Sequence, residues 1–221
     1  LKSIKISEKR LEGLIPKELS TFEFCESLDL SKNKGLKGDI NTIFHMKNLE
    51  YLDLSNKSSA DNADLTDVDS QGFDCQTNIK QCKTLFEQHS SESFTRGGLN
   101  GDIRGLVKLT KLKHCYLSGN YFVGELPTFN HPDLLTLDLS VNDLSSLGSG
   151  RHNLPKCGSI DLSHNKIRSA FSDWKCDDPK KLKLTDFRIH NNQLYGGIPK
   201  DLPKHILGVN EESGELNYKN F

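Results

Sequence analysis

The chain has 221 residues, enough for one elongated domain or two compact ones, and carries 29 lysines and arginines against 30 aspartates and glutamates. This balance excludes the strongly basic character that recruits nucleic acid or an anionic membrane surface. No stretch approaches the roughly 18 consecutive apolar residues of a membrane-spanning helix. Only 34% of the residues are hydrophobic, so we expect a regular core in which each segment buries one side.

A short phrase recurs along the chain and predicts one strand in each copy. It sets three aliphatic residues among variable ones and often ends in Ser-x-Asn, as in residues 28–33. Seven copies are recognisable, and a frayed eighth lies near residues 202–210. Apart from one interval of 63 residues, equivalent positions recur every 22 to 27 residues, which is a solenoid period. The period-two alternation points the aliphatic side chains one way, so stacked copies form a parallel sheet.

The asparagine of this phrase predicts a ladder inside the stack. Its side chain can bond backbone groups of its own turn and of the next turn, where the chain bends away from the sheet. We therefore assign it a structural role.

A second phrase, which contains glycine, follows the first in five repeats, as in residues 36–40 (Leu-Lys-Gly-Asp-Ile). The two phrases together resemble the plant-type leucine-rich repeat, best known from receptor-kinase ectodomains and polygalacturonase-inhibiting proteins. The resemblance implies an α/β solenoid, a right-handed superhelical horseshoe with a parallel β-sheet on its concave face and short strands and 3₁₀ turns outside. Residues 1–221 then form a single domain of about seven to eight repeats. Two repeats lack the glycine, at 144–147 and 167–170, so we expect a less regular convex face there.

Equivalent variable positions stack into columns on the concave face. The middle column runs Lys5, Asp29, Asp53, Tyr116, Asp138, Asp161 and Arg188. Aspartate is usual at this position of the repeat, so the acidic run is interpreted as consensus. Departures from it are more informative, because Tyr51, His114 and Tyr116 gather on two neighbouring repeats and predict a contact patch. Ordinary surface variation is the alternative. The binding candidates are Tyr51, Asp53, His114, Tyr116, Asp138 and Arg188.

An insertion of roughly 39 residues interrupts the third repeat, because Leu54 and Leu117 lie 63 residues apart where one repeat needs about 24. We assign residues 57–98 as one island insertion. It resembles the island domains of some plant receptor ectodomains, which implies a ligand pocket beside the repeats of Tyr51 and Tyr116. A tolerated surface insertion is the alternative. Cys75 and Cys82 lie within it and are the natural disulfide pair.

Other single-site signals are weaker. The sequon at residues 56–58 makes Asn56 a glycosylation candidate. Asp67, Asp69 and Gln71 resemble the first half of a calcium loop, but Asn78 stands where the bidentate glutamate would be, so an acidic solvated loop is favoured. No other cofactor or metal is expected.

Three further cysteines occupy aliphatic positions of the repeat. Cys25, Cys115 and Cys157 are therefore expected to be buried free thiols. Cys176 has no obvious partner. The paired cap cysteines common in extracellular relatives of this repeat class are missing, which either counts against an extracellular location or means that the caps were lost.

No phosphate-binding loop, serine nucleophile elbow or zinc-protease motif occurs, so we expect no enzymatic activity. The main hypothesis is an extracellular or cell-surface binding module that recognises a protein, peptide or glycan partner through its concave face and island. The alternatives are a structural or assembly subunit, which would be compatible with an oligomer, and an inhibitor of a secreted hydrolase.

Overall fold

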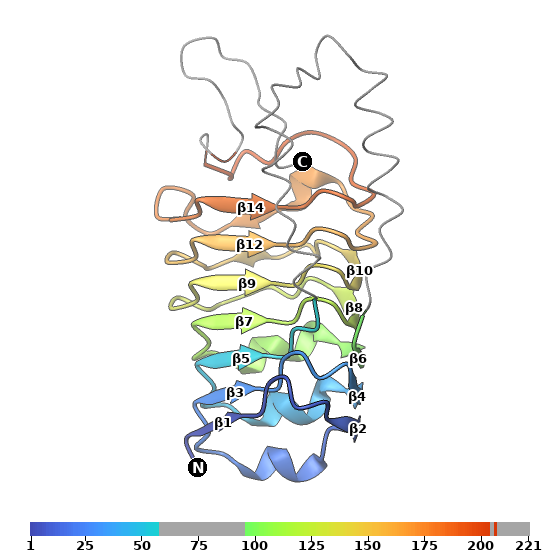
Figure 1. Cartoon of the computed structure of the whole chain (residues 1–221). Coiled ribbons are helices and arrows are strands. Elements are labelled where there is room, and N and C mark those ends of the chain that lie inside the picture. The colour runs from blue at the N-terminus through green and yellow to red at the C-terminus, as the bar shows by residue number, and fades with distance from the viewer. Residues whose placement is uncertain (58–95, 204–205, 207–221) are drawn as a thin grey trace, which may run out of the picture.

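The computed structural model describes residues 1–57, 96–203 and 206, which stack into one solenoid (Figure 1). One sheet runs through all its repeats. Its seven strands are parallel and follow one another in chain order. They are β1 (Ser3–Lys5), β3 (Ser27–Asp29), β5 (Tyr51–Asp53), β7 (His114–Tyr116), β9 (Thr136–Asp138), β12 (Ser159–Asp161) and β14 (Asp186–Arg188). The expected leucine-rich-repeat sheet is confirmed.

The strands of this concave sheet pair in a constant register. Tyr51 lies opposite His114 and Asp53 opposite Tyr116, and the next pair places Tyr116 opposite Asp138. The columns expected from the sequence are therefore real neighbours in space. β5 pairs directly with β7 although residues 54–113 separate them, so the insertion leaves the sheet continuous.

The outer side of the solenoid holds a second parallel sheet and short 3₁₀ helices. The sheet contains β2 (Glu12–Leu14), β4 (Gly35–Asp39), β6 (Gly98–Asp102), β8 (Tyr121–Glu125) and β10 (Asp143–Ser146). The helices are η1 (Lys17–Thr21), η2 (Ile40–His45), η5 (Ile103–Lys108) and η6 (Phe171–Asp173), and β11 (Arg151–His152) pairs with β13 (Lys175–Cys176). The register of β10 against β8 shifts between Leu144 and Ser146, and the second sheet ends there. This confirms the less regular convex face expected in that part.

The hydrophobic core fills the space between the two sides. The strand aliphatics are almost completely buried, among them Leu28, Leu52, Leu137 and Ile160. Burying each such side chain contributes roughly 1.5 to 3 kcal/mol. The first repeat is less covered, because every residue of β2 is exposed and η1 has no buried residue.

The asparagine ladder lies at the edge of this core. The Nδ2 of Asn142 donates to the carbonyl oxygens of Leu139 and Leu117, both at 3.1 Å, and its Oδ1 accepts the Phe122 N–H at 3.1 Å. The structural role is confirmed. The Asn142 side chain bonds the preceding repeat, so the predicted bond to the next repeat is wrong. Equivalent bonds are made by Asn33, Asn165 and Asn192.

Candidate functional site

Three aromatic rings gather on the concave face where β5 pairs with β7. The ring centroid of Tyr51 lies 6.1 Å from that of His114 and 5.9 Å from that of Tyr116. The rings of His114 and Tyr116 are almost parallel, at 8°, with centroids 6.2 Å apart. They meet because residues two apart on a strand share a face, and Tyr51 stands directly across from His114. We call these three side chains the aromatic cluster.

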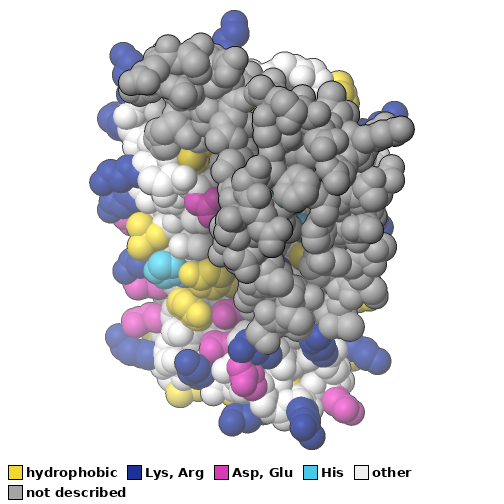
Figure 2. Space-filling model, turned by 45° about the horizontal axis from the view of Figure 1, so that its top comes forward, with side chains coloured by type: hydrophobic (Ala, Val, Ile, Leu, Met, Phe, Trp, Pro, Cys, Tyr) yellow, Lys and Arg dark blue, Asp and Glu magenta, His cyan; other side chains and the backbone are white. Residues whose placement is uncertain are grey.

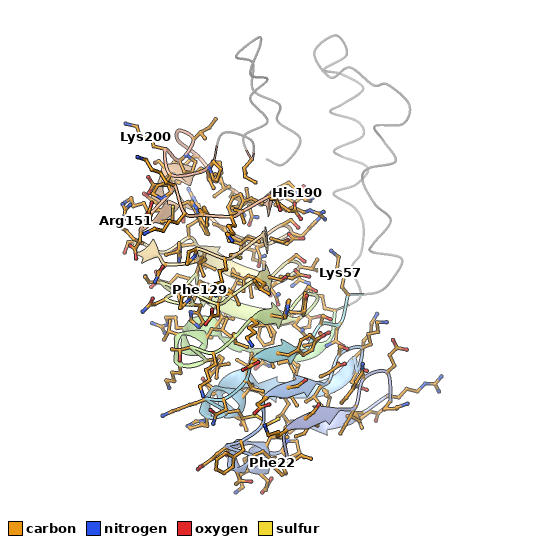
Figure 3. All side chains as sticks on the ribbon, turned by 90° about the vertical axis from the view of Figure 1, so that its left-hand side faces the viewer. Phe22, Lys57, Phe129, Arg151, His190 and Lys200 are labelled. Carbon is orange, nitrogen blue, oxygen red and sulfur yellow. The ribbon has the colours of Figure 1, made fainter. Side chains whose placement is uncertain are left out.

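The aromatic cluster is accessible from solvent. All three residues are half-buried. Figure 2 shows hydrophobic side chains next to a histidine on this face, with acidic side chains bordering them. Figure 3 shows Lys57 and His190 on one side of the solenoid and Phe129 and Arg151 on the opposite side.

Each aspartate around the cluster accepts hydrogen bonds from the serine two residues further along its own turn. One carboxylate oxygen of Asp53, Oδ1, accepts the backbone N–H of Ser55 at 2.9 Å and its hydroxyl at 2.7 Å. Asp138 binds Ser140 in the same way, at 3.0 and 2.7 Å. Asp29 and Asp161 repeat the arrangement. Each carboxylate therefore has a structural oxygen, Oδ1. The second oxygen, Oδ2, contacts Lys5 in Asp29 and the Tyr51 hydroxyl in Asp53, and is the one left for a partner.

The charges of this face repel one another. Burial raises the pKa of Asp53, and the neighbouring Asp29 adds to the rise. Burial likewise raises the pKa of Asp138, and Asp161 adds to it. Burial together with Asp53 and Asp29 raises the pKa of Tyr51 to about 12. The register accounts for the repulsive part of these shifts, because it stacks aspartates on adjacent strands, which lie about 4.8 Å apart.

Arg188 does not join the aromatic cluster. It lies on β14, separated from β7 by β9 and β12. Its Nε donates to Oδ1 of Asp186 at 3.1 Å. The structure thus brings together Tyr51, Asp53, His114, Tyr116 and Asp138 and leaves Arg188 apart.

Both points at which the chain leaves and rejoins the solenoid are held by the following repeat. The N–H of Asn56 donates to the Ser118 carbonyl, and the N–H of Gly97 to the Gly119 carbonyl, each at 2.8 Å. Arg96 also donates to Oδ1 of Asp143 at 2.9 Å, and its guanidinium lies 5.3 Å from the centroid of the Tyr121 ring. Sequence reasoning missed Arg96, because Asp143 is 47 residues away and follows no local pattern.

The structure buries Asn56, the glycosylation candidate. Only 1% of the residue is exposed. Its Nδ2 donates to the Leu54 carbonyl at 3.3 Å and to Oδ1 of Asn120 at 3.0 Å. A glycan on this nitrogen would have to break the ladder, so the geometry counts against it. The modification itself stays a prediction.

Several predicted sites lie outside the described residues. These are most of the island, Cys75, Cys82, and the calcium candidates Asp67, Asp69 and Gln71. Among the residues that the structure does describe, no group of three histidine, cysteine or acidic side chains could hold a metal ion. In the same part of the chain, no helix has the length and apolarity needed to cross a membrane.

The cysteines of the solenoid are buried free thiols. This confirms the expectation for Cys25, Cys115 and Cys157 and extends it to Cys176. Burial raises the pKa of Cys157 to about 12 and that of Cys176 to about 11. None of the four has the lowered pKa of a reactive thiolate.

Two histidines inside the outer half of the solenoid were not expected from the sequence. His152 stacks on Trp174 with centroids 4.6 Å apart, and its Nδ1 accepts the Phe129 N–H at 3.3 Å. Both ring nitrogens of His131, Nε2 of His152 and Nε1 of Trp174 are buried without a hydrogen-bond partner. Burial lowers the pKa of His152 to about 4 and also lowers that of His131. These side chains belong to the core and have no contact with the aromatic cluster.

Solved structures similar to this chain include plant receptor ectodomains. The leucine-rich-repeat ectodomain of the receptor kinase GASSHO1/SCHENGEN3 from Arabidopsis thaliana, in complex with CASPARIAN STRIP INTEGRITY FACTOR 2, matches with a TM-score of 0.59 and 23% identity, over 86% of this chain and 18% of that one. The Arabidopsis HAESA ectodomain with an extended IDA peptide hormone matches with a TM-score of 0.52 and 20% identity, over 90% and 31%.

A second HAESA structure, with IDA and the co-receptor SERK1, gives a TM-score of 0.53 at 21% identity, over 90% of this chain and 31% of that one. The chain thus spans less than a third of these ectodomains. No family model and no curated protein sequence matches it. The likeness shows that the protein has the plant-type leucine-rich-repeat fold.

Proposed function

We propose that this protein is a non-enzymatic binding module that recognises a peptide or an extended protein segment on its concave face. The observation that carries the proposal is the aromatic cluster. Tyr116 interrupts a column that is otherwise mostly aspartate, and Tyr51 and His114 extend the interruption across two strands. Tyrosine is one of the residues enriched at the energetic hot spots of protein interfaces.

The geometry suits a peptide. Tyrosine presents a large apolar area with only two rotatable side-chain bonds, so little entropy is lost when it contacts a partner. Asp53 and Asp138 lie on either side of Tyr116 in the middle column, and their Oδ2 atoms can accept hydrogen bonds from a partner. Both described ends of the insertion lie next to the repeat that carries Tyr116, because Asn56 and Gly97 bond that repeat. A glycan partner would use the same rings.

The similar solved structures support the peptide interpretation. The HAESA ectodomain is bound to a peptide hormone, and its fold is shared by this chain. An extracellular or cell-surface location is part of the proposal, since these neighbours are ectodomains. The four buried free thiols and the buried Asn56 lend this location no support.

One observation favours the alternative of an assembly subunit. The first repeat exposes large apolar side chains, with Leu1, Leu14 and Phe24 between 71 and 75% exposed. Both β1 and β2 are edge strands, and an open edge with apolar side chains is suited to pack against another chain or repeat. Among the described residues, nothing separately favours an inhibitor of a secreted hydrolase.

The test is selection of binding peptides from a random display library, followed by affinity measurement with variants. The change to alanine at both Tyr51 and Tyr116 should weaken a selected peptide by about 1 to 3 kcal/mol per site. Tyr195→Ala, at a residue that is 60% exposed and lies outside the concave sheet, is the matched control and should change little. If the selected peptides bind the double variant with unchanged affinity, the binding site lies away from Tyr51 and Tyr116, and the assembly alternative is favoured.

A further inference from the structure

The concave face around the aromatic cluster carries an excess of negative charge. The two outward columns of the sheet contain Asp29, Asp53, Asp138, Asp161 and Asp186, against two cations, Lys5 and Arg188. Arg188 is paired with Asp186 on its own strand. Lys5 reaches only Oδ2 of Asp29, at 3.8 Å.

Asp53 is a half-buried carboxylate beside the cluster. Among the described residues, no lysine or arginine lies within 4 Å of it, and its Oδ1 is used by Ser55. Its Oδ2 lies 3.4 Å from the Tyr51 hydroxyl, long for a hydrogen bond. Lys57 acts on the other side of the cluster, where it offsets part of the rise in the pKa of Asp138. Lys32 interacts with Asp53 only at longer range, and its ammonium is paired with Glu8. Burial is the main cause of the rise in the pKa of Asp53, and the groups that oppose this rise, Ser55 and Tyr51, carry no positive charge.

Aromatic rings next to an unpaired carboxylate form a site for a cation. The faces of tyrosine rings attract a guanidinium or ammonium group within about 6 Å of the ring centroid. The described part of the chain already makes such a contact, where Arg96 lies over Tyr121. An anionic group would meet the field of Asp53 and Asp29, and a purely aliphatic group would leave Asp53 Oδ2 covered and unpaired.

We propose that the aromatic cluster and Asp53 together bind a cationic side chain, arginine or lysine, of the partner peptide. The cation lies against Tyr51 and Tyr116 and pairs with Oδ2 of Asp53. This inference rests on the proposed function, since it names the chemistry of the partner at the same site.

The probe is a capped tripeptide, acetyl-Gly-Arg-Gly-amide, titrated against the full chain with ¹³C-labelled tyrosine rings. Its control carries citrulline, which has the shape of arginine without the charge. The arginine peptide should shift the Tyr51 and Tyr116 resonances saturably and leave those of Tyr121 and Tyr195 in place. The citrulline peptide should need at least tenfold higher concentration, and raised salt should weaken the arginine peptide.

Two matched variants test whether the negative charge of Asp53 is the one that binds the arginine peptide. Asp53→Asn should weaken the arginine peptide to the level of citrulline. Asp161→Asn makes the same change in the same column but two strands beyond Tyr116, and should alter binding less than twofold. Equal binding of arginine and citrulline, a preference for a glutamate tripeptide, or the absence of saturable shifts at Tyr51 and Tyr116 would overturn the inference.

These outcomes are separable from failure of the proposed function. If library-selected peptides lose affinity when Tyr51 and Tyr116 are changed, while arginine and citrulline bind alike, the site stands and only its preference for a cation is wrong. If the affinity of the selected peptides does not change when Tyr51 and Tyr116 are replaced, both proposals fail.

Discussion

The consensus aspartates of the concave face and the buried histidines of the outer half differ in how far their hydrogen-bonding groups are satisfied. On the concave face each consensus aspartate is bonded to the serine two residues further on, as Asp138 is to Ser140. In the outer half, both ring nitrogens of His131 and Nε2 of His152 are buried without a partner. The aspartates of the concave face thus form a repeated, self-satisfied frame. Departures from the repeat stand out on it, including His114, whose Nδ1 is buried without a partner, whereas the outer half is core with titratable residues enclosed.

The largest effect should separate two residues of neighbouring repeats that face opposite ways. Leu139 is 1% exposed, so Leu139→Asp buries an unpaired charge and should cost several kcal/mol of unfolding free energy. Tyr116→Ala, on the solvent side of the neighbouring strand, should cost less than about 1 kcal/mol. Urea denaturation measures both. Equal losses would mean that the strand aliphatics are not the core.

The next effect is the pH dependence of the outer half. The folded pKa of His152, about 4, lies below the ordinary value of 6.5, so the unfolded chain takes up the proton first as the pH falls. Stability is therefore fully present above about pH 6.5 and is lost toward pH 4. The loss from His152 alone should be about 2 kcal/mol between pH 7 and pH 5.

Variants isolate this contribution. His152→Phe should lose less stability than the parent chain over the same interval, whatever its absolute stability. His45→Gln, at an exposed histidine, should behave as the parent. His131 acts with the same sign as His152, and the raised pKa of Asp53 and Asp138 acts with the opposite sign. A pH dependence unchanged in His152→Phe would contradict the assignment.

A smaller effect concerns the consensus carboxylates. Asp138→Ala removes the acceptor of two Ser140 bonds and should cost about 1 kcal/mol. Asp138→Asn keeps an acceptor and removes a buried charge repelled by Asp161, so its unfolding free energy should stay within about 0.5 kcal/mol of the parent. Urea denaturation at pH 7 distinguishes the two. A greater loss in the asparagine variant would mean that the charge stabilises the frame.

Much of the frame could be predicted, because the repeat itself encodes it. The spacing of Leu30, Leu54 and Leu139 in their repeats correctly predicted the strands, their parallel order and the columns of the concave face. The juxtaposition of Tyr51 with Tyr116 followed from the same register. The repeat also predicted the asparagine ladder, although it assigned the wrong neighbour.

The rest depends on contacts that no local pattern carries. The burial of Asn56 arises from its bond to Asn120, 64 residues away, which the sequon cannot reveal. Arg96 and Asp143 meet only because two repeats stack. The stack of His152 on Trp174 joins residues of different repeats that match no phrase.

The most direct test of the central claim is hydroxyl-radical footprinting of the tyrosines with and without a library-selected peptide. Tyr51 and Tyr116 lie on the concave face, while Tyr121 and Tyr195 lie outside the concave sheet and are 45 and 60% exposed, so one molecule contains both the site and its controls. Bound peptide should slow the oxidation of Tyr51 and Tyr116 and leave that of Tyr121 and Tyr195 unchanged. Protection of Tyr121 or Tyr195 with unaltered oxidation of Tyr51 and Tyr116 would contradict the central claim.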